Sequence, residues 1–411
     1  SFRFGILQEL SFHMPKKALT DIDVKGKKVL VRVDFNVPIE QGASGIALYD
    51  QRLRSTLPTI EYLRNQSSIV ILCSHLGRPK GEVDEELRLA PIGDRLSQLL
   101  GCPVTSLSDC VGQDISTHIS HLEPGDVVLL ENVRFHPGEE TNDEDFIKSL
   151  ASLADVFIMD AFAVAHRSHA SVVGITKHLP SAMGLLVKQE VDSMTKALDH
   201  PETPMAALLG GAKVSDKILV VEHLLDRLDH LIIGGGMSVT FLNACQKPTG
   251  ASRVESDRIE FAQWVMEEAG RRGTQVHLPK DLVVASEFSP TPSKVDIVGV
   301  DQVPDGWFIM DIGPRSAEAF ANILGECKTI IWNGPMGVFE MDNYKRGTVT
   351  IGESIANMSG VTTVVGGGST AEAVESMGIS DKLTHVSTGG GASLEFLEGK
   401  VLPGIDALPN K

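Results

Sequence analysis

Short runs of aliphatic and β-branched residues alternate along the chain with stretches whose apolar residues recur every three or four positions. Nine runs predict buried strands of parallel sheets, because they are short, continuous and apolar. They occupy residues 29–33, 69–72, 127–130, 156–159, 206–209, 231–233, 329–332, 362–365 and 384–387. Helical spacing follows at 53–63 (after Asp50, a suitable N-cap), 187–198 and 218–228. This alternation is typical of βαβ units, so we expect an α/β fold with mainly parallel sheets.

The length of the chain indicates more than one domain. At 411 residues it exceeds what a single hydrophobic core usually supports. We expect a first domain at 14–184, a joining helix and candidate hinge at 185–199, and a second domain at 200–391. Residues 1–13 contain no continuous apolar run, so we interpret them as an extension or expression scar and not as a signal peptide.

Composition narrows the function classes. Asp and Glu number 54 against 37 Lys and Arg, a net charge of −17, which argues against nucleic acid or an anionic membrane as the main partner. No apolar stretch approaches the roughly 18 residues of a membrane span. The five cysteines are scattered without a CxxC pair, so neither a disulfide framework nor a zinc site is indicated. Reduced thiols and a cytoplasmic location are the expectation.

The residues that follow the predicted strands differ between the two halves. Before about residue 170 they are mainly Arg, His, Asp and Asn, and after residue 200 they are mainly Gly and Lys. Ligands of open parallel sheets bind beyond the carboxyl ends of the strands. The sequence therefore predicts two anionic ligands, one bound by cationic side chains and one by backbone amides.

The Gly-rich half has features of a phosphate site. Glycine lets backbone N–H groups approach phosphate closely, and helix N-termini add partial positive charge. The glycines at 366–368 run into a capping-box pattern at 369–372, and those at 389–391 precede another helical pattern. Lys217, four residues after Lys213, is expected in the first turn of a helix, where the helix dipole disfavours a cation. A polyphosphate between the two lysines explains this placement better than a solvated surface does.

Two familiar nucleotide signatures are absent from the sequence. Neither GxxxxGK[ST] nor GxGxxG occurs, which disfavours a P-loop protein and a dinucleotide dehydrogenase.

The Arg-rich half has features of a small anion pocket. Guanidinium groups match phosphate and carboxylate bidentately. The basic residues at these strand ends are Arg52, Arg78, Arg134, Arg167, His75, His166 and His169. Asp34 and Asn36 can orient a substrate hydroxyl, although Asp34 can equally cap a turn. The histidines have no carboxylate at ligand spacing, so they do not indicate a metal.

Nine segments resemble, in sequence and in order, the motifs of the phosphoglycerate kinase family. They are VRVDFNVP (31–38), SHLGRP (74–79), ENVRFH (131–136), DAFAVAHRSH (160–169), GGAKVSDK (210–217), IGGGM (233–237), WNGPMGVFE (332–340), GGGST (366–370) and STGGGA (387–392). The resemblance covers residues 14–411. It implies two Rossmann-like domains joined by a helix, with residues 392–411 returning to the first. It also implies reversible phosphoryl transfer between 1,3-bisphosphoglycerate and ADP, giving 3-phosphoglycerate and ATP in glycolysis.

The resemblance implies roles for individual residues. The 3-phosphoglycerate site would comprise Asp34, Asn36, Arg52, His75, Arg78, Arg134 and Arg167. The nucleotide site would comprise Gly211, Lys213, Lys217, Gly235, Gly236, Gly313, Asn333, Pro335, Glu340, Gly366, Gly367, Gly368, Ser369 and Thr370. The transfer itself would depend on Arg52, Lys213, Lys217, Gly368 and Gly390. Mg²⁺ would accompany the nucleotide, and a monomer is expected.

Two departures from the family pattern qualify this picture. The family commonly has Asp after GGG as a magnesium ligand, whereas this chain has Ser369, which can meet Mg²⁺ directly, through water, or only cap its helix. We therefore expect weaker Mg–nucleotide affinity than in an Asp-bearing relative. The usual Gly-Thr before AHR is Ala163-Val164 here, which could shift the loop that presents Arg167.

Two alternative functions stay open at the level of sequence. One is a different small-molecule kinase that phosphorylates another carboxylate. The other is a catalytically inactive nucleotide-binding scaffold, which loss of Arg52, Lys213 or Lys217 would favour; all three are present.

Overall fold

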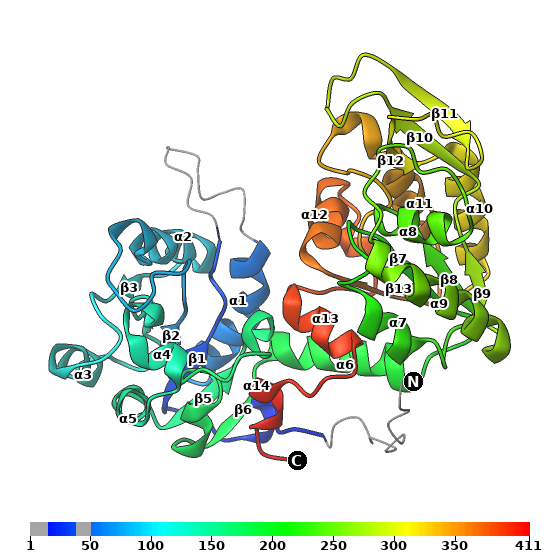
Figure 1. Ribbon diagram of the computed structural model, residues 1–411. Helices are drawn as coiled ribbons and strands as arrows, with labels where there is room; N and C mark the ends of the chain where they lie inside the picture. Colours follow the sequence, from blue (N-terminus) through cyan, green and yellow to red (C-terminus); the bar gives the residue numbers. More distant parts are fainter. Residues whose placement is uncertain (1–14, 38–50) are drawn as a thin grey trace. The chain divides into compact units, whose positions relative to one another are not determined.

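The computed structural model describes residues 15–37 and 51–411 (Figure 1). The chain forms two compact units, Ser1–Val191 with Val401–Lys411 (the first unit) and Asp192–Lys400 (the second unit). Four features of the sequence lie outside the described residues: the extension at 1–13, the start of the resemblance at Met14, the motif residue Pro38 and the expected cap Asp50.

A six-stranded parallel sheet forms the centre of the first unit. Its order is β3-β4-β2-β1-β5-β6, and neighbouring strands pair in register, as Val29 does with Val70. The strands are β1 (Lys28–Arg32), β2 (Ile69–Cys73), β3 (Val104–Ser106), β4 (Val127–Leu129), β5 (Val156–Met159) and β6 (Ser181–Met183). The four strands predicted in this half are confirmed. The sequence did not predict β3 and β6, because three residues are too few to show an apolar run.

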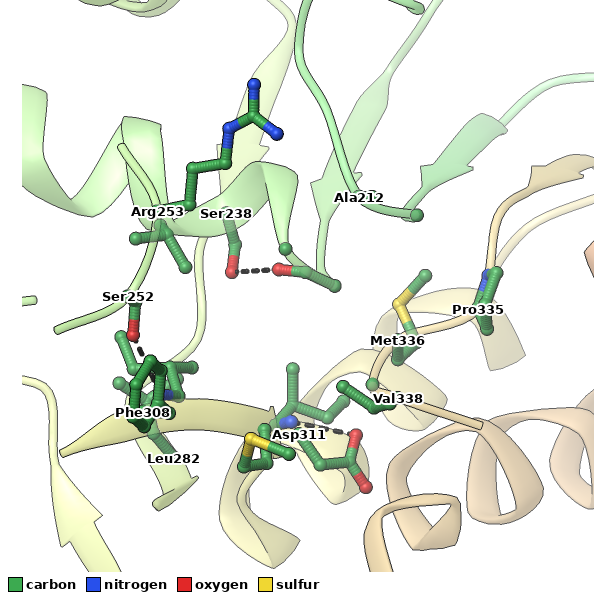
Figure 2. Close-up of a pocket in the computed structure, with 18 of the residues that line it drawn as sticks. Ala212, Ser238, Ser252, Arg253, Leu282, Phe308, Asp311, Pro335, Met336 and Val338 are labelled. Carbon is green, nitrogen blue, oxygen red and sulfur yellow. Dashed lines mark hydrogen bonds between the residues drawn. The ribbon is translucent and has the colours of Figure 1, made fainter. Parts of the chain in front are cut away.

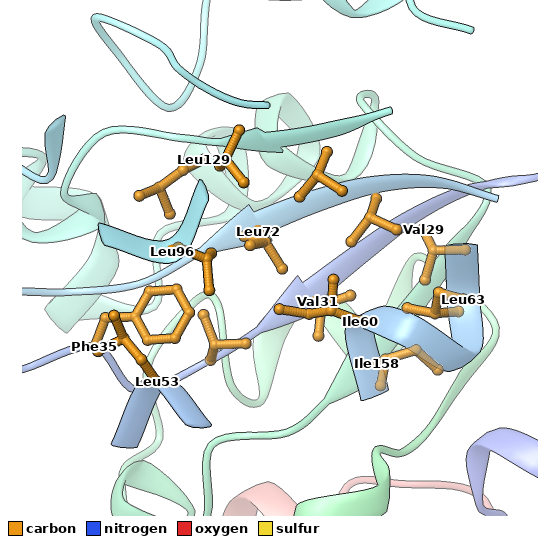
Figure 3. Packing of buried hydrophobic residues seen from close by; sticks show 14 of the residues in the cluster. Val29, Val31, Phe35, Leu53, Ile60, Leu63, Leu72, Leu96, Leu129 and Ile158 are labelled. Atoms are coloured by element: carbon orange, nitrogen blue, oxygen red, sulfur yellow. The ribbon is translucent and has the colours of Figure 1, made fainter. Parts of the chain in front are cut away.

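Helices cover this sheet and fill its core. They are α1 (Gln51–Asn65), α2 (Ala90–Leu100), α3 (Gln113–Ser120), α4 (Pro137–Thr141) and α5 (Glu144–Ala151). Leu53 and Ile60 of α1 and Leu96 of α2 pack against Val31 and Leu72 of the sheet (Figure 3). Because Leu53 and Ile60 are fully buried, α1 has a fixed rotation about its axis, which also fixes the side of the helix from which Arg52 projects.

The second unit contains a parallel sheet and a smaller antiparallel one. The parallel sheet has the order β15-β14-β13-β7-β8-β9, and the antiparallel sheet has the order β11-β10-β12. The strands are β7 (Met205–Leu209), β8 (His230–Ile233), β9 (Gln275–His277), β10 (Asp281–Ala285), β11 (Val295–Gly299), β12 (Phe308–Ile312), β13 (Thr329–Asn333), β14 (Thr362–Gly366) and β15 (His385–Val386). All five predicted strands are confirmed. The sequence predicted neither β9 nor the three strands of the antiparallel sheet. Strand β9 has only three residues, and β11 is largely exposed and shows no continuous apolar run.

The helices of the second unit are α7 (Ile218–Leu224), α8 (Met237–Ala244), α9 (Ile259–Arg272), α10 (Pro314–Gly325), α11 (Arg346–Ala356), α12 (Gly368–Ser376) and α13 (Gly391–Leu397). Two helix starts differ from the sequence-based expectation. Lys217 is the N-cap of α7 and not part of its first turn. The carboxylate of Glu255 accepts hydrogen bonds from the Ser215 hydroxyl (2.7 Å) and from the Ser215 backbone N–H (3.3 Å). These bonds hold Ser215 in the loop, so the helix begins only after it. Gly367 is the N-cap of α12, without a side-chain cap, so Ser369 lies inside the first turn.

The division between the units falls inside α6 (Leu185–Asp199), between Val191 and Asp192. The Asp160 carboxylate fixes the start of α6 by accepting hydrogen bonds from the N–H groups of Leu186 (3.0 Å) and Val187 (3.3 Å).

The end of the chain belongs to the first unit. Gly404, in α14 (Pro403–Asp406), donates its N–H to the Ala165 carbonyl at 2.8 Å. Residues 392–400, which the sequence-based division grouped with the first domain, belong to the second unit, where α13 contacts α7. Among the described residues, no helix has both the length and the apolar character needed to cross a membrane.

Candidate active site

Polar and basic residues gather beyond the carboxyl ends of four strands in the first unit. Asp34 and Asn36 follow β1, His75 and Arg78 follow β2, Arg134 follows β4 and Arg167 follows β5. Arg52 lies in the first turn of α1. Since these strands are parallel neighbours, their ends meet at one edge of the sheet. We refer to these seven residues as the arginine cluster.

Hydrogen bonds connect several members of the arginine cluster. The Asp34 carboxylate accepts a hydrogen bond from the Arg52 guanidinium and another, at 3.1 Å, from the Asn36 N–H. The Asn36 side-chain carbonyl accepts from the Gly77 N–H at 2.9 Å, and the Arg134 guanidinium donates to the Gly77 carbonyl at 2.8 Å. The pocket is therefore shaped before any ligand arrives, and Asp34 is both an orienting group and the counter-ion of Arg52.

His75 is buried and uncharged at neutral pH. Burial lowers the pKa of its imidazole well below the usual value, and the charges of Arg32, Arg134 and Arg52 lower it further. The Arg32 guanidinium lies 3.2 Å from Nδ1 of His75. Since arginine can only donate hydrogen bonds, Nδ1 must accept, and the single proton lies on Nε2. His75 thus offers a neutral N–H donor.

A buried network that sequence reasoning missed supports the arginine cluster. Arg32, which is fully buried in β1, donates its Nε–H to the Ser171 hydroxyl at 2.8 Å. The Ser171 hydroxyl donates to the buried Glu139 carboxylate at 2.7 Å, and the Ser171 N–H donates to it at 2.9 Å. One signal was available: Arg32 interrupts an otherwise apolar strand, and a buried arginine needs partners.

Arg78 and Arg167 are exposed members of the arginine cluster. For Arg78, no ion pair is found among the described residues. Burial is the main cause that lowers the pKa of both Arg134 and His169, and the charge of Arg167 lowers each pKa further, so Arg167 acts on the same pocket. Burial lowers the pKa of His169 to about 4, opposed by Glu139, so this imidazole is also neutral near pH 7.

A cavity of about 510 Å³ lies in the second unit (Figure 2). Its volume is within the range typical of small-molecule sites. Six of the predicted nucleotide-binding residues line it: Gly211, Gly235, Gly236, Pro335, Glu340 and Ser369. Its apolar wall comprises Val239, Leu282, Phe288, Phe308, Ile309, Met310, Met336 and Val338. The flat shape and apolar faces of a purine base suit such a wall.

The sequence did not point to several residues of this wall. Phe288, Phe308 and Ser252 belong to the antiparallel sheet and to loops, and Arg253 stands at the edge of the cavity without a motif around it. Figure 2 shows the Ser238 hydroxyl, which donates to the Gly235 carbonyl at 2.7 Å and so fixes the glycine loop at its edge. These residues come together only through the tertiary fold.

A smaller cavity of about 290 Å³ adjoins the first, because Gly211, Ala212 and Ser369 line both. Its other lining residues are Gly210, Lys213, Asp216, Lys217, Asn333, Gly334, Gly367, Gly368, Gly390, Gly391 and Leu394. We refer to it as the lysine cavity. A base-sized cavity that continues into a cavity lined by glycines and lysines has the dimensions and polarity of a nucleotide site.

Polar groups in the lysine cavity are available to an anion. Burial lowers the pKa of Lys217 to about 8, so it is mostly protonated at pH 7, and its ammonium donates to the Asn333 side-chain carbonyl. The buried Nδ2 of Asn333 has no hydrogen-bond partner. Lys213 has no ion pair or hydrogen bond among the described residues. Buried donors without partners are rare, so the cavity is organised for an acceptor-rich ligand.

Close backbone packing explains the glycines around these cavities. Gly235 has φ +60°, and a Cβ on it would lie 2.6 Å from the Gly211 backbone nitrogen. Gly334 has φ +102°, and its Cβ would lie 2.3 Å from the Gly210 carbonyl. Any side chain at these positions would separate the loops that follow β7, β8 and β13.

Three predicted nucleotide-binding residues line neither cavity. Gly313 packs on Asp281, whose carboxylate would lie 2.3 Å from an added Cβ. The Thr370 hydroxyl accepts the Gly334 N–H at 2.7 Å, and Gly366 is buried at the end of β14. Their contacts hold the loops that form the site.

Together, the arginine cluster and the nucleotide-sized cavities define an α/β phosphotransferase with a small anionic substrate. The comparisons with known proteins agree. The family model of phosphoglycerate kinase matches residues 19–400. A curated phosphoglycerate kinase of Moorella thermoacetica is 51% identical over 398 residues, which cover 97% of this chain and 100% of the relative.

Solved structures give the same result. The phosphoglycerate kinase of Coxiella burnetii matches with a TM-score of 0.85 and 37% identity, over 96% of this chain and 98% of that one. The phosphoglycerate kinase of Pyrococcus horikoshii OT3 matches with a TM-score of 0.84 and 33% identity, over 95% of this chain and 98% of that one. The chain belongs to the phosphoglycerate kinase family, and it is a phosphotransferase with a carboxyl group as acceptor.

Proposed function

We propose that this chain transfers a phosphoryl group reversibly between 1,3-bisphosphoglycerate and ADP, giving 3-phosphoglycerate and ATP. The observation that carries the proposal is the lysine cavity, in which Lys213, Lys217 and the unpaired Asn333 amide meet the glycines of two helix starts. A nucleotide would place its base in the larger cavity and its phosphates in the lysine cavity, with Glu340 beside the ribose.

The arginine cluster is the proposed site of the glycerate substrate. Its carboxylate and phosphate match the guanidinium groups of Arg134, Arg167 and Arg78, and the neutral Nε2–H of His75 adds a directional donor. The Asp34 carboxylate would accept a hydrogen bond from the substrate hydroxyl, and the Asn36 side-chain amide would donate one to it. We assign residues 14–184 with the returning segment Val401–Lys411 to this substrate and residues 200–391 to the nucleotide.

The chemistry requires alignment and charge neutralisation. In the ATP-consuming direction, a carboxylate oxygen of 3-phosphoglycerate forms a bond to the γ-phosphorus of ATP while the bond from that phosphorus to the bridging oxygen breaks, leaving ADP. A carboxylate carries no proton at neutral pH, so no general base is needed. Arg52, Lys213, Lys217 and the N–H groups at Gly368 and Gly390 would stabilise the negative charge on the transferring group.

Magnesium is proposed to arrive with the nucleotide. A carboxylate, Asp216, and a hydroxyl, Ser369, line the lysine cavity, and with phosphate oxygens they would form the hard, oxygen-only ligand set that Mg²⁺ prefers. The residues present therefore fit the ion, although the chain supplies few of its ligands. When bound, Mg²⁺ neutralises phosphate charge, as it does in other phosphotransferases.

Direct transfer requires the two substrates to meet. We propose that the chain bends around α6 when both substrates are bound. We also propose that the protein acts as a monomer in the cytoplasm, without nucleic acid or membrane partners. Small-angle scattering should show a smaller radius of gyration with both substrates than with either alone. An unchanged radius under double occupancy would contradict the bending.

One assay tests the proposed reaction. ADP formation from ATP should depend on 3-phosphoglycerate and on Mg²⁺, with glycerate and other small carboxylates as comparison substrates. Activity with 3-phosphoglycerate at least about a hundredfold above that with glycerate is expected, because glycerate lacks the phosphate and would leave the arginines without their partner. Equal activity with another carboxylate would mean that 3-phosphoglycerate is not the specific acceptor. No turnover with any of the tested carboxylates would indicate a nucleotide-binding scaffold.

A further inference from the structure

Asp109, Cys110 and His136 converge beyond the ends of β3 and β4 in the first unit. Each residue contributes one possible ligand atom: a carboxylate oxygen, the thiol sulfur and an imidazole nitrogen. These three atoms lie within 4.8 Å of one another. His136 lies 26 positions after Cys110, so their spacing in the sequence gave no indication of a site. None of the three belongs to the arginine cluster.

The three side chains are held in place by their surroundings. Nε2 of His136 lies 2.7 Å from the Asp109 carboxylate, and the His136 ring stacks on Phe146 with centroids 5.3 Å apart. The same Asp109 oxygen accepts the Cys110 backbone N–H at 2.6 Å. The backbone carbonyl of Asp109 accepts the Glu131 N–H at 3.3 Å, which ties the loop after β3 to the end of β4.

The Cys110 thiol is the least satisfied member of the group. Its residue is fully buried, it is a free cysteine, and no hydrogen bond of the thiol is found among the described residues. Burial raises the thiol pKa well above its usual value, and the electrostatic neighbours Asp109, Glu139 and Cys73 all raise it further. A metal ion would give the Cys110 sulfur the partner that none of the described residues supplies.

We propose that Asp109, Cys110 and His136 form a binding site for a divalent transition metal ion of the zinc class. Nitrogen, sulfur and oxygen ligands from three residues are a typical set for Zn²⁺ and Co²⁺. The side chains of His136 and Asp109 are 31% and 50% exposed, so water can reach a fourth position. On binding, the Cys110 proton is released to solvent and the Asp109–His136 hydrogen bond is exchanged for coordination. The ion would fasten the loop after β3 to the turn that carries Arg134.

Cobalt is a suitable probe because its spectrum reports the ligands. The reduced, chelator-treated full-length protein is titrated with Co²⁺ alone. We expect one ion per chain, a near-ultraviolet thiolate-to-cobalt band and the strong visible bands of four-coordinate Co²⁺, all lost on adding Zn²⁺. Absence of these bands at millimolar Co²⁺ would overturn the proposal.

Variants separate this site from adventitious binding. Cys110→Ser should remove the thiolate band, and Asp109→Asn and His136→Gln should each weaken Co²⁺ binding about tenfold or more. Cys245→Ser is the matched control, since Cys245 is exposed and outside the group, and it should keep the full spectrum. A thiolate band that persists in Cys110→Ser overturns the proposal. Should that variant fail to fold, unchanged Co²⁺ affinity in both Asp109→Asn and His136→Gln has the same consequence.

Discussion

The arginine cluster and the lysine cavity both bind anions in the proposed reaction, but they do so with different chemistry. The arginine cluster uses side-chain cations, two of which already have carboxylate partners: Asp34 for Arg52, and Glu140, 3.3 Å from Arg134. The lysine cavity uses backbone N–H groups, two lysines and the unpaired Asn333 amide. The first site is organised by ion pairs, whereas the second is organised by glycines that let loops pack closely.

The two sites also differ in how pH acts on them. Arginine stays protonated in proteins, and the pKa values of His75 and His169 are lowered far enough that both are neutral near pH 7. The charge of the arginine cluster therefore changes little between about pH 6 and 9. The charge of the lysine cavity does change, because the pKa of Lys217 is about 8.

The largest expected effect tests the assignment of Arg52 to the transition state. Arg52→Ala should lower kcat by about 10³-fold, the scale of an arginine that neutralises a transferring phosphoryl group. Nucleotide Kd, measured by calorimetry, should change less than about twofold, because a transition-state contact does not contribute to ground-state binding.

The control for Arg52 is on the same helix. Arg54→Ala, an exposed position of α1, should keep kcat within a few-fold. Equal losses of kcat and of nucleotide affinity in Arg52→Ala would contradict the role, as would a kcat similar to that of Arg54→Ala.

A second effect tests the pH difference between the sites. The lowered pKa means that Lys217 loses its proton as pH rises through about 8, so nucleotide affinity should fall above pH 8 while 3-phosphoglycerate affinity stays flat. Bound phosphates favour the charged lysine, so binding at pH 8 should take up a fraction of a proton. Calorimetry in buffers of different ionisation enthalpy measures this uptake. Lys217→Gln should abolish it and lower kcat by about 10²-fold or more.

Lys247 provides the comparison for this prediction. Its ammonium pairs with Asp301 at 2.6 Å away from the cavity, so Lys247→Gln should leave proton uptake and kcat unchanged. Proton uptake that survives in Lys217→Gln would assign the titration to another group.

A third test concerns the backbone N–H groups of the lysine cavity. A Cβ on Gly368 would meet no atom within 4 Å in the free protein, and no positive φ is found there. Gly368→Ala should therefore fold with an unchanged unfolding temperature. The methyl group would stand where a phosphate must approach, so kcat should fall on the order of ten- to a hundredfold.

Gly270→Ala, in α9, is the matched control for Gly368→Ala because its Cβ also enters open space. It should leave kcat unchanged and slightly raise the unfolding temperature, since alanine is the better helix former. Full activity in Gly368→Ala would mean that the phosphates are not bound against the start of α12.

Sequence reasoning recovered the residues that stand in local patterns. Long apolar runs located nine strands, and the clusters behind them led to Asp34, Arg134 and Lys217. It missed what depends on long-range contacts. Arg32 is connected to Glu139 through Ser171, and neither Ser171 nor Glu139 stands in a motif. The wall residue Phe308 lies in an antiparallel sheet that no periodicity revealed, and Phe288 lies in a loop beside it. Loop packing also decided where two helices begin. Lys217 caps α7 where its first turn was expected, and α12 begins before the capping-box pattern at 369–372.

The smallest expected effect tests Ser369, where the phosphate site departs from the family pattern. Its side chain is exposed in the first turn of α12 and lines both cavities. Ser369→Asp should tighten Mg–nucleotide binding by about tenfold or less, because a carboxylate adds a charged oxygen ligand and is favoured near a helix N-terminus. The measurement is nucleotide Kd as a function of free Mg²⁺. Ser369→Ala distinguishes the possible roles of the hydroxyl: a weaker Mg²⁺ dependence than in the unaltered chain indicates a ligand, and an equal one indicates that phosphates alone hold the ion. An unchanged Mg²⁺ dependence in Ser369→Asp would show that the ion does not approach α12. The lysine cavity would then hold the metal, like the phosphates, without a carboxylate or hydroxyl side chain from this helix.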